Sequence, residues 1–421
     1  MLLGCIADDL TGATDLAIML TRAGMRTLQL MQPPAEGDPR LSGYDAIVVA
    51  LKTRTCPVDE AISLSLASAQ ALQEQGARQL YFKYCSTFDS TGNGNIGPVA
   101  EALLAHIGSD LAIVCPAFPT NKRTVYMGNL FVGDVPLAES PMKDHPLTPM
   151  RDSNLVRVMQ AQTRGKVDLV PYPVVEKGRT AIANAFAEAQ ARGERFVVVD
   201  AITDRDLVEM GAATADMPLV TAGSGVALGL PQNFIAKGLM KPAPAPATMK
   251  APTGRAAILA GSCSEATRRQ VANAKAQGLA ALEIDAVALA DRTQTTDEII
   301  AWTSAQPSDR PFLVYSSADP ATVLEVQEKL GREAAGSLVE RAIATVAKAL
   351  VAENVTRLSV AGGETSGAVV NGLGITALEI GPEIDPGVPW TRAIGQDQVL
   401  ALKSGNFGAP DFFTKAWEKL S

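Results

Sequence analysis

Short apolar runs alternate with amphipathic helical stretches along most of this chain. The expected strands are residues 2–7, 46–51, 79–84, 111–115, 196–200 and 218–221 in the first half, and residues 256–260, 280–284, 311–315, 357–361 and 376–380 in the second. Apolar strands separated by helices are typical of parallel sheets that are flanked by helices. The sequence therefore predicts an α/β protein with largely parallel sheets.

A segment rich in proline and alanine, residues 241–254, divides the chain. It begins Lys-Pro-Ala-Pro-Ala-Pro-Ala and has no apolar periodicity. Repeated prolines favour an extended backbone, and such segments act as spacers. We therefore expect one domain over residues 1–240, a linker over 241–254 and a second domain over 255–421, each of a normal size for a domain.

Composition excludes several classes of protein. The 421 residues are 47% hydrophobic and 19% charged, which is typical of a globular chain. Lys and Arg number 37 against 45 Asp and Glu, and a net charge of −8 argues against a nucleic-acid partner, which needs a basic face. The start of the chain lacks a signal-peptide pattern, and no uncharged apolar run is long enough to cross a bilayer. We expect a cytoplasmic protein with neither a membrane nor a nucleic-acid partner.

The cysteines and histidines are too few and too scattered for common metal sites. The five cysteines are odd in number and never spaced C-x-x-C, so neither a disulfide framework nor a zinc site is indicated. The only histidines are His106 and His145, which makes a His-dependent catalytic relay a narrow target.

Two adjacent carboxylates, Asp8 and Asp9, lie between the first expected strand and a helix. Open α/β sheets bind ligands beyond the carboxyl ends of their strands. The pair could accept hydrogen bonds from substrate hydroxyls, and one carboxylate could take a proton from an attacking oxygen. The alternative is that they cap the helix, for which Asp and Thr are ordinary residues. One Asp would suffice for a cap, and both interpretations remain open.

Cations and hydroxyl groups lie at or just after three further expected strands. They include Arg54, Lys83, Ser86 and Arg123. In a parallel sheet these strand ends converge, and Arg and Lys together suit a small carboxylate or phosphate. Each residue alone would be a solvated loop charge, so it is their shared position that predicts an anion site.

Three glycine-containing loops in the second half indicate a nucleotide site. Residues 260–265 (AGSCSE) and 361–367 (AGGETSG) each follow an expected strand and open a helix, and residues 403–408 (KSGNFG) add a lysine. Small residues let backbone N–H groups approach phosphate oxygens at a helix N-terminus. One such turn is routine, but three in one domain favour a nucleotide site. The P-loop pattern is absent, which disfavours a Walker-type ATPase.

Four motifs, taken in order, resemble the four-carbon acid sugar kinase family. They are residues 6–15 (IADDLTGATD), 84–91 (YCSTFDST), 361–366 (AGGETS) and 402–408 (LKSGNFG). The resemblance spans nearly the whole chain. It implies two three-layer α/β domains, of which the N-terminal one binds a sugar acid and the C-terminal one binds ATP. It also implies transfer of the ATP γ-phosphoryl group to the terminal hydroxyl of a four-carbon acid, with Mg²⁺ bridging the phosphates.

The resemblance and the strand-end pattern together define the expected site. The expected catalytic residues are Asp8 and Asp9, and the expected substrate contacts are Thr11, Arg54, Lys83, Ser86 and Arg123. The expected ATP-binding residues are Ser262, Ser264, Gly362, Gly363, Glu364, Thr365, Lys403, Gly405 and Asn406. The metal ligands stay unknown, with Glu364 the nearest candidate carboxylate.

Three alternatives remain open. The acceptor could be a 3-oxo-tetronate or a reduced acid such as threonate or erythronate. A non-catalytic sugar-acid sensor would be a protein of a different class. A dinucleotide-dependent oxidoreductase lacks the G-x-G-x-x-G pattern after the first strand. A homo-oligomer is the default expectation for a cytoplasmic enzyme.

Overall fold

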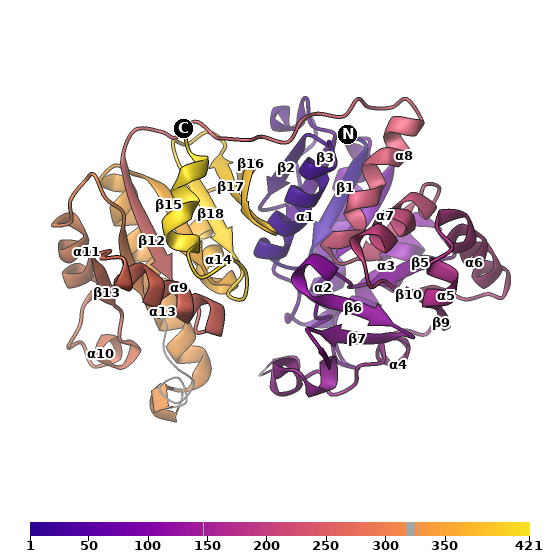
Figure 1. Cartoon of the computed structure of the whole chain (residues 1–421), viewed down its shortest axis with the longest axis horizontal. Coiled ribbons are helices and arrows are strands. Elements are labelled where there is room, and N and C mark those ends of the chain that lie inside the picture. Colours follow the sequence, from indigo (N-terminus) through magenta and orange to yellow (C-terminus); the bar gives the residue numbers. More distant parts are fainter. Residues whose placement is uncertain (146, 317–324, 327) are drawn as a thin grey trace. The chain divides into compact units, whose positions relative to one another are not determined.

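The computed structural model divides the chain into two compact units, Met1–Ala245 and Pro246–Ser421 (Figure 1). The structure describes residues 1–145, 147–316, 325–326 and 328–421. The division falls within the segment that is rich in proline and alanine.

The first unit is built on an eight-stranded sheet in which every neighbouring pair is parallel. Its strands are β1 Leu3–Ala7, β2 Thr27–Leu30, β3 Ala46–Ala50, β4 Gln79–Lys83, β5 Ala112–Cys115, β9 Val167–Val170, β10 Phe196–Val199 and β11 Leu219–Ala222. Their order is β2-β3-β1-β4-β11-β5-β10-β9. The central strands are buried on both faces, as expected where helices cover both sides of a parallel sheet.

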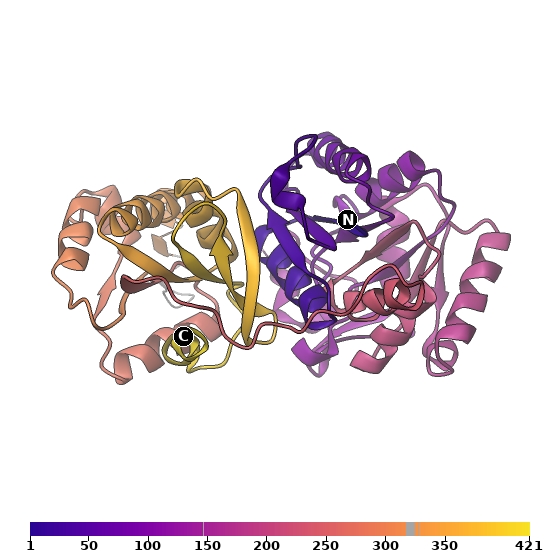
Figure 2. The same ribbon diagram turned by 90° about the horizontal axis from the view of Figure 1, so that it is seen from above.

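Helices lie on both faces of this sheet (Figure 2). The α-helices are α1 Leu10–Arg22, α2 Val58–Glu74, α3 Ile96–Ile107, α4 Leu155–Gln162, α5 Tyr172–Val175, α6 Arg179–Ala191, α7 Asp204–Ala213 and α8 Leu230–Ala236. A small antiparallel sheet is formed by β6 Arg123–Tyr126, β7 Asn129–Val132 and β8 Val135–Pro136. Short 3₁₀ turns occupy Pro39–Leu41, Pro119–Asn121, Leu137–Glu139, Pro141–Asp144 and Ser224–Gly229.

In the second unit the strands follow the order β13-β14-β12-β15-β18-β17-β16. Its strands are β12 Arg255–Ala260, β13 Ala281–Glu283, β14 Phe312–Tyr315, β15 Val355–Ala361, β16 Ala377–Asp385, β17 Val388–Ala393 and β18 Val399–Lys403. The pairs from β13 to β18 are parallel, and β17 is antiparallel to both β18 and β16. The helices bounded within its described residues are α9 Glu265–Ala276, α10 Ala286–Ala290, α11 Thr296–Ser304, α13 Arg332–Ala352, α14 Gly363–Gly372 and α15 Phe412–Lys415, and a 3₁₀ turn lies at Ala416–Lys419.

The predicted α/β class with largely parallel sheets is confirmed. Every expected strand is present, within a few residues of its expected bounds, although β16 runs on to Asp385. The structure adds β2, β9, β17, β18 and the small antiparallel sheet, which sequence patterning did not indicate. In the part of the chain that the structure describes, no helix combines the length and apolarity that a bilayer span requires.

Each sheet has a point where the chain changes direction across it. In the first unit the chain passes from β1 to β2 and β3 on one side, then crosses to β4 on the other side of β1. In the second unit it passes from β12 to β13 and β14, then crosses to β15. The loops beyond the carboxyl ends of strands at such a switch point are where open α/β sheets bind ligands.

Candidate functional site

The first site begins with two carboxylates placed by the junction between β1 and α1. Asp9 is the N-cap of α1, and its side chain accepts hydrogen bonds from the Gly12 N–H at 3.0 Å and the Thr11 hydroxyl at 2.9 Å. The capping interpretation therefore describes part of what Asp9 does. Asp8 caps nothing, which leaves its carboxylate to interact with other strand ends.

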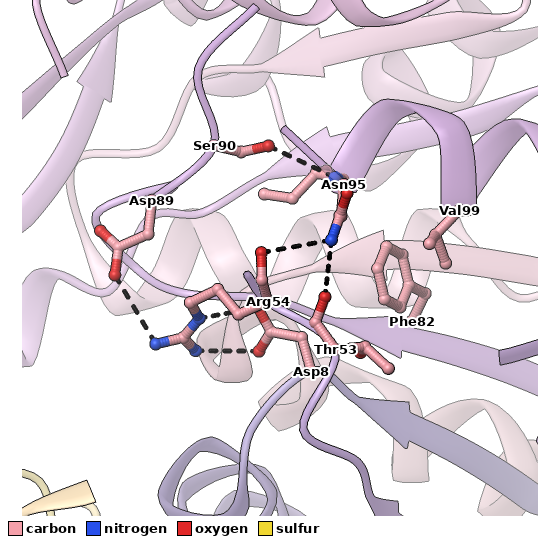
Figure 3. Close-up of a pocket in the computed structure, with 9 residues that line it drawn as sticks. Asp8, Thr53, Arg54, Phe82, Asp89, Ser90, Asn95 and Val99 are labelled. Atoms are coloured by element: carbon pink, nitrogen blue, oxygen red, sulfur yellow. Dashed lines mark hydrogen bonds and ion pairs between the residues drawn. The ribbon is translucent and has the colours of Figure 1, made fainter. Parts of the chain in front are cut away.

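Arg54, from the loop after β3, joins these carboxylates into one cluster. Its Nε and Nη2 donate to the two oxygens of Asp8 at 2.9 and 2.8 Å, and Nη2 also donates to Asp9 at 2.7 Å. Its Nη1 lies 3.6 Å from Asp89 on the opposite side (Figure 3). Lys83, the last residue of β4, places Nζ 3.7 Å from the same Asp9 oxygen. The switch point thus gathers three carboxylates and two cations.

Asn95 fixes the loop that carries Arg54. It precedes α3, but its side chain makes no capping hydrogen bond. Instead, its amide donates to the carbonyls of Thr53 at 2.8 Å and Arg54 at 3.4 Å (Figure 3). It also donates to the carbonyl of Cys56 at 2.9 Å. Asp8, Arg54 and Asn95 also line a small pocket together with Thr53, Phe82, Asp89, Ser90, Ile96 and Val99. Because Asn95 acts through backbone carbonyls rather than through charge, strand-end reasoning did not find it.

Gly12 is what allows Lys83 to approach the carboxylates. A Cβ atom at this position would collide with Lys83 Nζ and with the Asp9 carboxylate. The glycine in the motif of residues 6–15 is therefore explained by a close approach of side chains, not by an unusual backbone angle.

Burial and charge push the proton affinities of the two carboxylates apart. Burial raises the pKa of Asp8, and the opposing charge of Arg54 does not fully offset it. Burial also acts on Asp9, but the charges of Arg54 and Lys83 and the hydrogen bonds from Thr11 and Gly12 lower its pKa to about 2. Asp8 therefore has the higher affinity for a proton of the two carboxylates, and a difference of this kind is how paired groups come to have different acid–base roles.

The structure does not bring every expected residue of this unit into the cluster. Asp8, Asp9, Thr11, Arg54 and Lys83 are joined directly, by the contacts given above. Ser86 lies half-buried in the loop after β4.

No direct contact joins Arg123 to the cluster among the described residues. It begins β6 of the small sheet, and one of its terminal nitrogens donates to the Asn121 carbonyl. It lies in the stretch that follows β5, beyond the 3₁₀ turn at Pro119–Asn121, and is therefore farther from its strand end than Arg54 is from the end of β3. Its buried Nε has no hydrogen-bond partner among the described residues.

The second site lies at the switch point of the C-terminal unit. Ser264 is the N-cap of α9, where its hydroxyl accepts from the Thr267 N–H at 3.2 Å and donates to the Gly405 carbonyl at 2.5 Å. The Ser262 hydroxyl accepts from the Ser264 N–H at 3.2 Å. These contacts join the loop after β12 to the loop after β18.

The loop after β15 completes this second site. Gly362 caps α14 with φ of +121°, and a Cβ atom there would lie 2.7 Å from the Thr365 hydroxyl. Its N–H donates to the Lys403 carbonyl at 2.9 Å. Gly363 begins α14, and Glu364 on its first turn is exposed. The N-termini of two helices therefore meet beside adjacent parallel strands, an arrangement that suits an anion such as phosphate.

Lys403 and Asn406 have contrasting positions in the third loop. Asn406 is exposed. Lys403 ends β18 and is fully buried, and burial lowers the pKa of its amine to about 7.

The described residues contain no group of three or more His, Cys, Asp and Glu side chains arranged to hold a metal ion.

Two family models match the chain, one in each of the two units. A sugar-binding N-terminal domain matches residues 3–230, and a nucleotide-binding C-terminal domain matches residues 257–413. The chain therefore belongs to the four-carbon acid sugar kinase family.

The curated relatives make the comparison more specific. A protein named 3-oxo-tetronate kinase from Cupriavidus necator is 52% identical over 421 residues, covering 100% of this chain and 97% of the relative. A protein of the same name from Burkholderia multivorans is 52% identical over 420 residues, with the same coverage. One from Salmonella typhimurium is 42% identical over 417 residues, covering 98% of each chain.

Two solved structures share the fold over their whole length. A Salmonella typhimurium structure, described as a tRNA synthase, has a TM-score of 0.88 and 42% identity and covers 100% of this chain and 99% of that chain. A Haemophilus influenzae structure has a TM-score of 0.78 and 42% identity, with 99% coverage of both chains.

Proposed function

We propose that this protein is an ATP-dependent 3-oxo-tetronate kinase. It transfers the γ-phosphoryl group of ATP to the C4 hydroxyl of 3-oxo-tetronate and forms 3-oxo-tetronate 4-phosphate. The observation that carries this proposal is 52% identity over the full chain to relatives of that name. The two polar switch points, one with a carboxylate cluster and one with paired helix N-termini, are consistent with two different ligands.

The unit Met1–Ala245 is proposed to bind the sugar acid, and Pro246–Ser421 to bind ATP. In the first, Asp9 is the carboxylate that a substrate reaches more easily, because its side chain is 25% exposed against 6% for Asp8. Asp9 orients the C4 hydroxyl. Asp8 accepts the proton, since it has the higher affinity for one. Phosphoryl transfer asks little covalent chemistry of the protein, so orientation and charge neutralisation dominate the catalysis.

Cations and hydroxyl groups around the pair complete the proposed acceptor site. Arg54 holds the two carboxylates that face the substrate, and Lys83 supplies positive charge where the transferred phosphoryl group arrives. Arg123, whose buried Nε has no partner in the described part of the chain, would hold the substrate carboxylate. Thr11 and Ser86 would donate or accept hydrogen bonds to the substrate oxygens.

The nucleotide is proposed to lie across the three loops of the second unit. The residues that would contact it are Ser262, Ser264, Gly362, Gly363, Glu364, Thr365, Lys403, Gly405 and Asn406. Mg²⁺ is held mostly by phosphate oxygens and water with one or two carboxylates, and exposed Glu364 fits the latter role. When bound, the ion would neutralise part of the phosphate charge.

The test is ADP release from Mg·ATP across a panel of D- and L-3-oxo-tetronates, threonates and erythronates, with each product identified by mass. We expect turnover with a 3-oxo-tetronate and a product that carries the phosphate on C4. Preference for threonate or erythronate would move the assignment within the family. Binding of an acid without any phosphorylation would instead favour a sensor.

A tRNA arm belongs in the same assay because one solved relative is described as a tRNA synthase. The net charge of −8 offers little electrostatic attraction to RNA, so we expect tRNA to have no effect on ADP release. A cytoplasmic location and a homo-oligomeric state stay predictions. Cell fractionation and sedimentation of the purified protein would test them.

A further inference from the structure

Lys403 is a fully buried lysine at the centre of the three loops of the C-terminal unit. Its Nζ donates to the Thr267 hydroxyl at 3.0 Å and to the carbonyls of Ser404 and Gly405, each at 3.1 Å. All three ammonium hydrogens are therefore satisfied. The Gly405 carbonyl also accepts from the hydroxyls of Ser264 and Thr267, so Lys403 belongs to the network that shapes the loop.

No carboxylate balances this charge in the described part of the chain. Glu265 on α9 pairs with Arg269, and Asp385 on β16 pairs with Lys415. Glu364 on α14 is exposed. The charged side chains of the neighbouring strands β15 and β17 are Arg357, which donates to the Gly254 carbonyl, and Arg392, which lies 3.9 Å from Glu379. Lys403 therefore has hydrogen-bond partners but no counter-charge.

A buried ammonium without a counter-ion is costly, even when it is fully hydrogen-bonded. Its acceptors are neutral and belong to the loops where two helix N-termini converge. Both features favour an anion in the same place.

We propose that Lys403 is a positioning residue whose charge is balanced by the nucleotide phosphates, so that nucleotide binding takes up a proton at this lysine. The proposal deepens the nucleotide-binding part of the proposed function and rests on it. Lys403 acts through Thr267 and Gly405, which it holds in the conformation that receives the phosphates. No covalent step is involved, and the proton comes from the solvent.

The sign of the pH dependence follows from burial. Without nucleotide, burial lowers the pKa of Lys403 to about 7, so the amine is largely neutral at pH 8. A bound phosphate favours the charged form and raises the pKa. Nucleotide affinity should therefore be constant below pH 7 and fall by about tenfold for each pH unit above it.

The test is calorimetric titration of the full-length protein with ADP, without sugar acid, from pH 6 to pH 9. Buffers of different ionisation enthalpy report the number of protons taken up. At pH 8 the wild type should take up close to one proton more than Lys403→Arg, in which the side chain stays charged. The affinity of Lys403→Arg should also stay constant between pH 7 and pH 9.

Two further variants separate this role from a structural one. Lys403→Met should lose most of the affinity for ADP at every pH and show no extra proton uptake. Lys348→Met makes the same change at an exposed position of α13 and should behave as wild type. If Lys403→Arg does not fold, comparing the ADP affinity and proton uptake of the wild type with those of Lys403→Met across the pH series still tests the role of Lys403.

The outcomes keep the two proposals apart. If the wild type binds no ADP between pH 6 and pH 9, the nucleotide-binding part of the proposed function is wrong. If it binds ADP with constant affinity and without proton uptake at pH 8, the proposed function stands and the role of Lys403 is overturned.

Discussion

At the scale of single residues, two neighbouring carboxylates share one arginine but differ in their affinity for a proton. Asp8 and Asp9 both contact Arg54 and both experience burial. The charge of Lys83 lowers the pKa of both carboxyls, but only Asp9 accepts hydrogen bonds from the Thr11 hydroxyl and the Gly12 N–H. These additional donors stabilise its charged form, and without them Asp8 keeps the higher pKa. The difference therefore arises in the first turn of α1.

Replacing Asp9 should remove most of the activity. Asp9→Asn keeps the shape of the side chain but removes the charge that faces Arg54 and Lys83. We expect kcat to fall by about 10²-fold, the order of magnitude for losing the orientation of a reacting group. The matched control is Asp152→Asn, which removes the partner of exposed Arg157. A folded Asp9→Asn variant with near-normal kcat and substrate affinity would show that the proposed role is wrong.

Replacing Lys403 should change how stability depends on pH. Between pH 7 and the ordinary pKa of lysine, the unfolded chain holds a proton that the folded chain has lost, so the free energy of unfolding rises with pH. The rise is on the order of a few kcal/mol and should be absent from Lys403→Met. At pH 7 the variant should be at least as stable as wild type, because the buried charge is gone.

Tryptophan fluorescence during urea unfolding of the unliganded protein measures this effect. Trp302, Trp390 and Trp417 all lie in the second unit, so the signal reports on that unit alone. Equal pH dependence in Lys403→Met and wild type, from pH 6 to pH 9, would contradict the assignment of the pKa shift to Lys403.

Residue types at strand ends predicted part of the first site. The convergence of Asp8, Asp9, Arg54 and Lys83 was expected from charged residues beside parallel strands, and the structure places them in contact. The convergence could be anticipated because a parallel sheet brings strand ends together regardless of the loops.

Asp89 and Asn95 could not be found in the same way. Asp89 follows a residue with φ of +63° and itself has φ of +31°, so its direction depends on an unusual loop backbone. Asn95 acts through the carbonyls of another loop. Sequence spacing does not encode either arrangement, because both depend on how two loops pack.

At the scale of elements, the glycines of α14 provide a matched test. The N-cap Gly362 has φ of +121° and little room beside Thr365, whereas a Cβ atom at Gly367, within the helix, would have nothing within 4 Å. Gly362→Ala should raise the KM for ATP by at least about tenfold and lower the free energy of unfolding by about 1–3 kcal/mol. Gly367→Ala should leave the KM unchanged and gain up to about 1 kcal/mol.

Steady-state kinetics and urea unfolding of the two variants check this prediction. If both substitutions changed the KM for ATP and the free energy of unfolding equally, a methyl group would have the same effect at the N-cap as within the helix. The loop after β15 would then have no special demand for glycine.

The elements that patterning missed have physical explanations. β2 contains Gln29, which is fully buried and accepts a hydrogen bond from Thr14, so its sequence lacks a continuous apolar run. β17 and β18 are partly antiparallel and follow a strand without an intervening helix. A prediction that expects a helix between successive strands does not find such strands.

At the scale of the whole molecule, two ligands should act on two separate units. ADP should slow hydrogen exchange in the loops at 261–264, 362–365 and 404–408, because bound phosphate orders helix N-termini. A 3-oxo-tetronate should slow exchange in the loops at 8–12, 53–56 and 85–95. Hydrogen-exchange mass spectrometry with each ligand alone measures both. Protection of the first unit by ADP and of the second by the acid would reverse the proposed assignment.

Arg54 already binds three carboxylates of its own chain. The cluster is therefore self-contained, and it does not depend on a particular acid for its assembly. Diversification of substrate preference can then proceed through side chains around the cluster, such as Ser86, while the ion pairs themselves stay unchanged. An enzyme built in this way can acquire a new acceptor acid without rebuilding the carboxylates that are proposed to handle the proton.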